Sequence, residues 1–172
     1  MLKVKIQSTA NPAFIDYLCR KSRYGSFILP NFRQKGSGGK IKQNRDFRQY
    51  YKNCAPLIDL VQPYLVKHYV SNHFFYSKYS HALDIYVFEM NKAFRLKVKS
   101  CGDFSKWLYP DFPEDFCLFD EQGACILYCQ THEDVCRLFG ESEREKKQYC
   151  DWGVVYEAYE DFVVDRPCIK TI

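Results

Sequence analysis

Residues 116–130 read FCLFDEQGACILYCQ, two apolar runs joined by a short polar turn. Gly123 closes the turn at the position where a hairpin needs a positive φ, which glycine adopts without steric cost. We therefore expect residues 116–119 and 124–130 to pair as an antiparallel hairpin. Hairpins of this kind are typical of α+β folds rather than of doubly wound ones.

Further strands are expected on both sides of this hairpin. Residues 2–6 alternate apolar and basic side chains, the period of a half-buried strand. Residues 83–89 and 94–99 are predicted to form a second hairpin around the turn at 90–92. Val, Tyr and Phe dominate residues 154–164, which favours a last extended strand.

Two long helical regions precede most of the strands. Asn11, followed by a proline, is predicted to cap a helix over residues 11–24. From residue 45 to about residue 70, apolar side chains recur every three or four positions, as they do on one face of a helix. Pro56 and Pro63 interrupt this stripe, so we expect two helices or one kinked helix.

Two later helices are predicted to be short. Asp103 is placed to cap the first, and Ser142 with Glu145 makes the capping-box pattern of the second. Earlier in the chain, glycine, serine and lysine residues favour a mobile basic loop over 33–43. Together the elements predict a single α+β domain over residues 1–172, with an antiparallel sheet of about five or six strands and the N-terminal helices packed on one face.

Composition favours a packed cytoplasmic protein without a membrane segment. The 172 residues are 47% hydrophobic and 17% aromatic, which is ample for a core. The first residues lack the pattern of a signal peptide, and the longest apolar runs fall far short of the ~18 residues of a spanning helix. Nine cysteines, an odd number scattered along the chain, are predicted to be reduced.

Charge is divided unevenly along the chain. Residues 1–50 hold eleven basic and two acidic side chains, whereas residues 101–172 hold seven basic and sixteen acidic ones. The basic part, which also carries aromatic residues, is compatible with nucleic-acid binding, and the acidic part with binding a cationic protein. The alternative is that the two parts attract each other within the fold.

One group of residues has the types that bind zinc. Cys125, Cys129, His132 and Cys136 follow one another at short spacings. On a strand, which rises about 3.3 Å per residue, Cys125 and Cys129 would lie roughly 13 Å apart, too far for one ion. We therefore predict no metal and no cofactor, and core thiols instead.

No catalytic residue is assigned from the sequence. One of three histidines (His73, His81 or His132) paired with Glu133 or Asp134 would suit acid–base cleavage of RNA. No spacing identifies a nucleophile, a base and an orienting group together, so we expect structural histidines.

Acidic and tyrosine residues of the second half form the predicted partner-binding set. Carboxylates raise association rates with a basic partner, and tyrosine supplies contact area with little loss of entropy. An ordinary solvated sheet face is the alternative. The residues are Asp111, Glu114, Asp115, Glu133, Asp134, Tyr156, Glu157, Tyr159, Glu160 and Asp161.

The stretch 107–119, WLYPDFPEDFCLF, running on to Thr131-His132-Glu133, resembles a pattern in small bacterial proteins that have no agreed activity. In that pattern, aromatic-Pro-x-x-Pro-Glu-Asp precedes a hairpin that ends in His-Glu. The resemblance covers about a sixth of the chain and implies no catalytic residues. Small acidic-faced proteins of this kind are similar in character to immunity proteins, which neutralise bacterial toxins.

The sequence therefore predicts a non-enzymatic immunity protein that occludes a cognate cationic toxin, with a nuclease domain as the expected target. A nucleic-acid-binding protein or small ribonuclease using the basic N-terminal region is the alternative.

Overall fold

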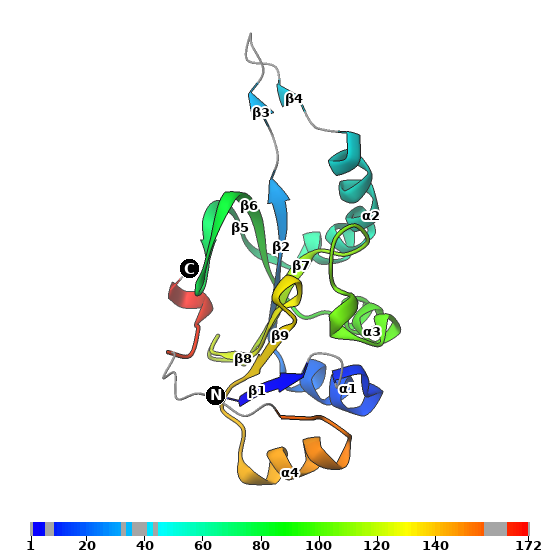
Figure 1. Cartoon of the computed structure of the whole chain (residues 1–172), viewed down its shortest axis with the longest axis vertical. Coiled ribbons are helices and arrows are strands. Elements are labelled where there is room, and N and C mark those ends of the chain that lie inside the picture. Colours follow the sequence, from blue (N-terminus) through cyan, green and yellow to red (C-terminus); the bar gives the residue numbers. More distant parts are fainter. Residues whose placement is uncertain are drawn as a thin grey trace.

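The computed structural model describes residues 2–5, 9–31, 34–35, 41–42, 45–156 and 165–171. Its centre is a seven-stranded antiparallel sheet with the strand order β1-β9-β8-β7-β2-β6-β5 (Figure 1). The antiparallel α+β class is confirmed, with seven strands in place of five or six. The strands are β1 (Leu2–Lys5), β2 (Tyr24–Asn31), β5 (Leu65–Phe74), β6 (Ser77–Glu89), β7 (Glu114–Phe119), β8 (Cys125–Gln130) and β9 (Val135–Leu138).

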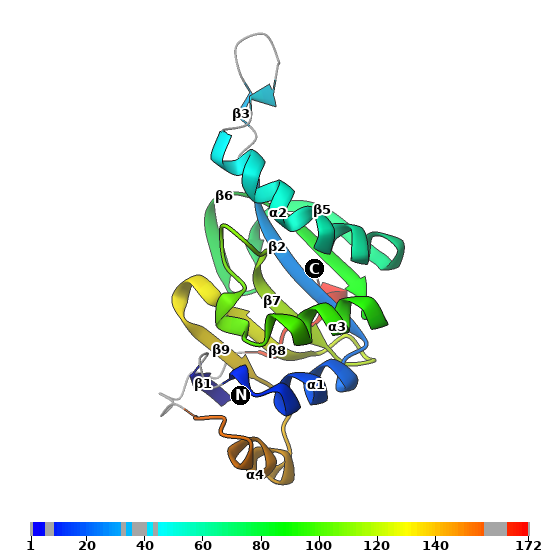
Figure 2. The same ribbon diagram turned by 90° about the vertical axis from the view of Figure 1, so that its right-hand side faces the viewer.

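Helices cover one face of this sheet. In Figure 2, α1, α2 and α3 lie in front of the strands, and α4 lies beyond α1 at the end of the molecule. The covering layer thus includes helices from the middle and the C-terminal half as well as the expected N-terminal ones. The helices are α1 (Pro12–Lys21), α2 (Arg45–Val61), α3 (Lys92–Cys101) and α4 (Glu143–Asp151), with short 3₁₀ turns η2 (Gln62–Tyr64), η3 (Phe104–Lys106), η4 (Thr131–Glu133) and η5 (Ile169–Thr171).

Strand β2 is the central strand of the core. Its residues are buried from Gly25 to Pro30, and their side chains alternate between the two faces of the sheet. Phe27 and Leu29 join the core beneath the helices, whereas Ile28 joins the core on the opposite face. Each large apolar side chain buried in this way contributes about 1.5–3 kcal/mol.

The predicted hairpin over 83–89 and 94–99 is wrong. Its first half belongs to β6, but its second half lies in helix α3, whose N-cap Asn91 accepts a hydrogen bond from the backbone of Phe94. Phe94 and Val98, four residues apart, are buried, while Leu96 is 56% exposed. The alternation of apolar and basic residues suggested a strand, but Phe94 and Val98 lie on one buried face of a helix.

The second helical region also differs from its prediction. Helix α2 runs without a break through Pro56 to Val61, and Pro63 lies in η2, which leads into strand β5. Residues 65–70 are thus strand, not helix. Strand β5 forms the edge of the sheet, and its Val66 and Val70 are exposed.

The described part of the 33–43 loop is a small ribbon. Strands β3 (Gln34–Lys35) and β4 (Ile41–Lys42) pair antiparallel, and the rest of the predicted loop lies outside the described residues. Most of the predicted last strand over 154–164 lies outside the described residues, although Tyr156 forms an isolated antiparallel bridge with Val4 of β1.

The hairpin that opened the sequence analysis is confirmed. Strands β7 and β8 pair antiparallel, and Gly123 in their turn has a φ of +82°. The capping box of α4 is present as well, with Ser142 and Glu145 each bonded to the other's backbone amide. Within the described residues, no helix combines the length and the apolar character needed to cross a bilayer.

Candidate functional site

The structure brings part of the predicted acidic set together at one end of β7. Asp111 is exposed in the loop before β7, and Glu114, the first residue of β7, is half-buried. Turn η4 contacts both β7 and η3, which places the exposed Glu133 and Asp134 beside them. Two sets of acidic residues that are well separated in the sequence are therefore neighbours in space.

Of the predicted residues near the C-terminus, the structure describes Tyr156 alone. Tyr156 is half-buried and its backbone is used by the bridge to Val4. The remaining four, Glu157, Tyr159, Glu160 and Asp161, lie outside the described residues.

Asp115 is fully buried, so its predicted role as a contact residue is wrong. Its side chain lies 3.2 Å from His132 Nδ1, and the Tyr79 hydroxyl donates a hydrogen bond to it. The backbone of Asp115 has a φ of +48°, a conformation that is uncommon for any residue other than glycine. A buried carboxylate needs such partners because removing an unpaired charge from water is costly.

His132 lies between two carboxylates. Its Nδ1 faces Asp115, and its Nε2 is 3.7 Å from Glu133 Oε1. The hydrogen bond with Asp115 raises the pKa of the His132 imidazole above its usual value, although partial burial opposes this shift. The negative charges of Asp115, Glu114 and Glu133 act in the same direction as that hydrogen bond.

A cavity of about 470 Å³ opens beside His132. It forms where β2 ends at its pairing with β6, and where β7 begins. Aromatic rings from three separate parts of the chain supply most of its wall. The lining residues are Pro30, Phe47, Tyr79, His81, Tyr109, Glu114 and His132.

Glu114 is the carboxylate of this cavity. Burial raises the pKa of its side chain, and the nearby charge of Asp115 raises it further, while His132 and a hydrogen bond from the Tyr109 backbone oppose the shift. Burial also lowers the pKa of His81, which favours a neutral imidazole on the same wall. Among the described side chains, no lysine or arginine forms an ion pair with Glu114.

A second cavity, of about 410 Å³, lies on the other side of His132 and Tyr79. Polar side chains in this cavity are bonded to one another. Gln130 donates to Ser77 Oγ at 2.7 Å and accepts a hydrogen bond from Arg137. The lining of this cavity is therefore polar, whereas that of the first cavity is mostly aromatic.

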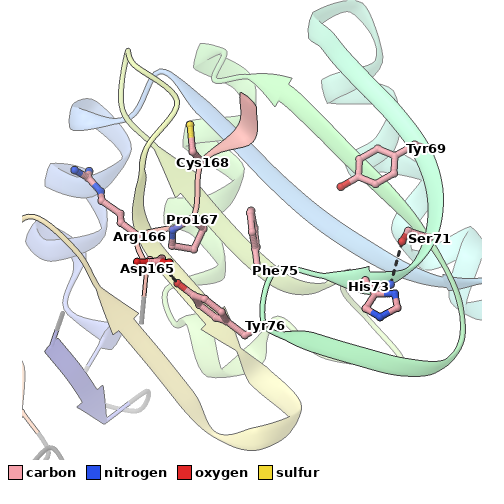
Figure 3. Close-up of a pocket in the computed structure, with 9 residues that line it drawn as sticks. All are labelled: Tyr69, Ser71, His73, Phe75, Tyr76, Asp165, Arg166, Pro167 and Cys168. Atoms are coloured by element: carbon pink, nitrogen blue, oxygen red, sulfur yellow. Dashed lines mark hydrogen bonds between the residues drawn. The ribbon is translucent and has the colours of Figure 1, made fainter. Parts of the chain in front are cut away.

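A third cavity lies between the β5–β6 hairpin and the C-terminal segment (Figure 3). The Tyr76 hydroxyl donates to the backbone oxygen of Asp165, which ties the two walls together. Arg166 points away from the cavity, where it bonds the backbone oxygen of Cys125 at 2.6 Å and Asp120 at 2.9 Å. Its guanidinium is thus directed away from this cavity, whose lining also combines aromatic rings with a carboxylate, that of Asp165.

Part of the basic N-terminal region is neutralised by acidic residues of the same chain. Lys21 pairs with Glu145 of α4 at 2.6 Å, and Arg23 pairs with Glu89 at 3.1 Å. Arg20 pairs with Asp16 on its own helix. Internal attraction between basic and acidic parts, the alternative stated above, therefore accounts for some of the charge division.

The cysteine–histidine group does not converge. Cys129 and Cys136 face each other across β8 and β9, with their sulfur atoms 2.7 Å apart in the core beneath the helices. Cys125 packs in the core of the opposite face, and His132 faces Asp115. Among the described residues, no three histidine, cysteine or acidic side chains are arranged to hold a metal ion.

Sequence reasoning missed most of the aromatic wall. His81 was considered only as a candidate acid–base histidine, and Tyr109 only as part of a short motif. Phe47 belongs to the apolar stripe predicted for a helix, and Tyr79 carries no signal, because the place of each in the cavity depends on contacts with residues more than thirty positions away, such as Asp115 for Tyr79. That Tyr79 lines the same cavity as the half-buried Glu114 can be recognised only when the positions of β6 and β7 in the sheet are known.

Comparison of the chain with protein-family models, with curated proteins and with solved structures finds no match. The chemistry of the site is therefore argued from its geometry.

Two kinds of chemistry fit this geometry. A cavity with aromatic walls and one carboxylate suits a cationic group. Proton transfer at His132 is the other, but both of its ring nitrogens face carboxylates, Asp115 at 3.2 Å and Glu133 at 3.7 Å. A general base keeps one nitrogen for the reacting group, as in triads. Binding is accordingly the better supported of the two.

Proposed function

We propose that this protein binds and occludes a cationic partner protein, in the manner of immunity proteins that neutralise bacterial toxins. A nuclease domain of a toxin, basic because it holds nucleic acid, is the expected partner. The observation that supports the proposal is an aromatic cavity lined by Glu114, at the end of β7 that the turn carrying the exposed Glu133 contacts. Aromatic anchors surrounded by exposed charges are the common anatomy of a protein interface.

A cytoplasmic site of action is part of the proposal. All nine cysteines are free, and six of them are buried, which suits a reducing compartment. Such a location would place the protein beside a toxin before the toxin is exported.

The proposal is tested with the purified products of the genes that flank the gene of this protein. Titration calorimetry is expected to detect tight, salt-dependent binding to one of them, and the complex is expected to lose nuclease activity on plasmid DNA. Replacing Asp111 and Glu133 together by lysine should slow association by at least tenfold at low salt. The matched control is the double change Glu121→Lys with Glu143→Lys, which reverses two exposed charges elsewhere. Equal slowing in both double variants would contradict the proposed surface.

A small ribonuclease is the second candidate, because the Asp115–His132 pair lies next to a cavity wide enough for a base. Its test is cleavage of a fluorescent single-stranded RNA. Cleavage that is abolished by His132→Gln and kept by His73→Gln would favour this candidate over occlusion. RNA that remains intact at micromolar protein would remove it.

A further inference from the structure

The cavity beside His132 has two walls built from ring pairs. Phe47 of α2 and Tyr109 have ring centroids 6.2 Å apart with the ring planes tilted by 53°, and Tyr79 lies edge-on at 6.0 Å from His81 on β6. Both pairs line the cavity, so a flat group entering it meets rings from α2, from β6 and from the segment before β7. Planar groups gain from such contact because the faces of aromatic rings carry partial negative charge.

The carboxyl group of Glu114 in the cavity wall has no ion-pair partner among the described lysines and arginines. Glu114 is the only carboxylate among the described residues that line the cavity, and its ionised form is disfavoured by burial and by neighbouring Asp115. His132, which carries positive charge when protonated, is held between Asp115 and Glu133. A cation from outside would therefore compensate Glu114 without displacing an existing ion pair.

We infer that the cavity is the receptor for one arginine side chain of the partner, with the guanidinium stacked between the rings and paired with Glu114. This inference rests on the proposed function. Arginine fits better than lysine because its flat guanidinium stacks on rings, forms two parallel hydrogen bonds with a carboxylate, and is less strongly hydrated. A volume of about 470 Å³ accommodates the side chain with room for water.

The test uses small probes and the full-length protein, so it does not depend on knowing the partner. Nα-acetyl-arginine amide is titrated into labelled protein and followed by NMR of the His81, His132 and Tyr109 signals. Nα-acetyl-citrulline amide, which has nearly the same shape and no charge, is the matched probe. The arginine compound is expected to bind on the order of tenfold more tightly than citrulline, with the lysine analogue between them.

Two variants separate charge from stacking. Glu114→Gln keeps the shape of the side chain and should remove most of the preference for arginine over citrulline. Tyr109→Ala removes a ring that is 41% exposed and should weaken both probes, whereas Tyr64→Ala, at a tyrosine that is 48% exposed outside the cavity, should weaken neither. The second variant keeps the test decisive if the first is poorly folded.

The outcomes distinguish this inference from the proposed function. Signals at His81, His132 and Tyr109 that do not move with arginine, or that move equally with citrulline, overturn the arginine receptor even if a toxin partner is found. Arginine binding with no partner among the flanking gene products leaves the receptor standing and removes the toxin. Stronger shifts with uridine monophosphate than with arginine would overturn the inference in favour of nucleic acid.

Discussion

Glu114 and Asp115 are consecutive carboxylates with very different surroundings. Asp115 is fully buried and has both His132 and Tyr79 as partners. Glu114 is half-buried in the cavity wall, and burial together with the charge of Asp115 raises its pKa. Asp115 is thus held by its partners. Glu114 is instead kept where its ionised form is unfavourable, as is often found at functional sites.

The raised pKa of Glu114 predicts that Glu114→Gln stabilises the protein at pH 7. A carboxyl group whose pKa is raised by folding contributes most to the free energy of unfolding below its unfolded pKa. This contribution is lost as the pH rises through the folded pKa. At neutral pH the wild type therefore carries a penalty that glutamine removes. We expect a higher midpoint in urea at pH 7 and a smaller gain at pH 4.

The control for this prediction is Glu133→Gln on the exposed turn η4, which should change the midpoint little. A Glu114→Gln variant that is less stable than the wild type at pH 7 would show that the carboxylate has a stabilising partner.

At the scale of elements, helix α4 is attached to α1 through Glu145. This carboxylate closes the capping box with Ser142 and also accepts hydrogen bonds from Lys21 and Tyr17, at 2.6 and 2.7 Å. Burial opposes ionisation, but the hydrogen bonds from Lys21, Ser142 and Tyr17 outweigh it and lower the pKa of Glu145 to about 2.

Two changes test this attachment. Ser142→Ala is expected to cost about 1 kcal/mol of unfolding free energy, the usual loss when a cap is removed. Because the folded pKa is lowered, the contribution of Glu145 is complete above its unfolded pKa of about 4.5 and is lost as the pH falls toward 2. Glu145→Gln should therefore be less stable than the wild type at pH 7, and the difference should shrink between pH 4.5 and pH 2 in thermal melts.

Helix α3 and strand β9 show where sequence reasoning reached its limit. Local signals sufficed for α1, for the β7–β8 hairpin and for the α4 capping box, since each depends on residues within a few positions. The alternation around Phe94, Leu96 and Val98 fits a strand or a helix, and only packing decides between them. Strand β9 has four residues, too few for a pattern, and exists because β1 and β8 pair with it.

The candidate site was predicted only in part for the same reason. Acidic composition pointed to Asp111, Glu114, Glu133 and Asp134, because charged residue types can be read directly from a sequence. The contact between Asp115 and Tyr79 spans 36 residues and two strands, so no local pattern reports it. Composition identified charge, but not which carboxylate would be buried.

At the scale of the whole molecule, the two cores leave most thiols inaccessible. Cys19, Cys54, Cys117, Cys125, Cys129 and Cys136 are buried, whereas Cys150 is exposed. Burial raises the pKa of a thiol, as it does for Cys19, to about 12, so that little reactive thiolate is present at neutral pH.

Mass spectrometry after brief alkylation at pH 7.5 should therefore find Cys150 modified first and the six buried cysteines protected. In 6 M guanidinium chloride all nine should react at similar rates. Rapid modification of Cys129 or Cys136 in the native protein would show that the sheet opens at β8 and β9 far more readily than its packing indicates.

Asp115 links three segments at one point: it is the second residue of β7, accepts a hydrogen bond from Tyr79 of β6, and pairs with His132 of η4. Removing one partner of a buried ion pair typically costs about 3–5 kcal/mol. A mutational scan that scores only partner capture would consequently rank position 115 among the strongest hits although the side chain touches no partner. Scans of this protein need a parallel measure of folded fraction, or this junction will be mistaken for an epitope.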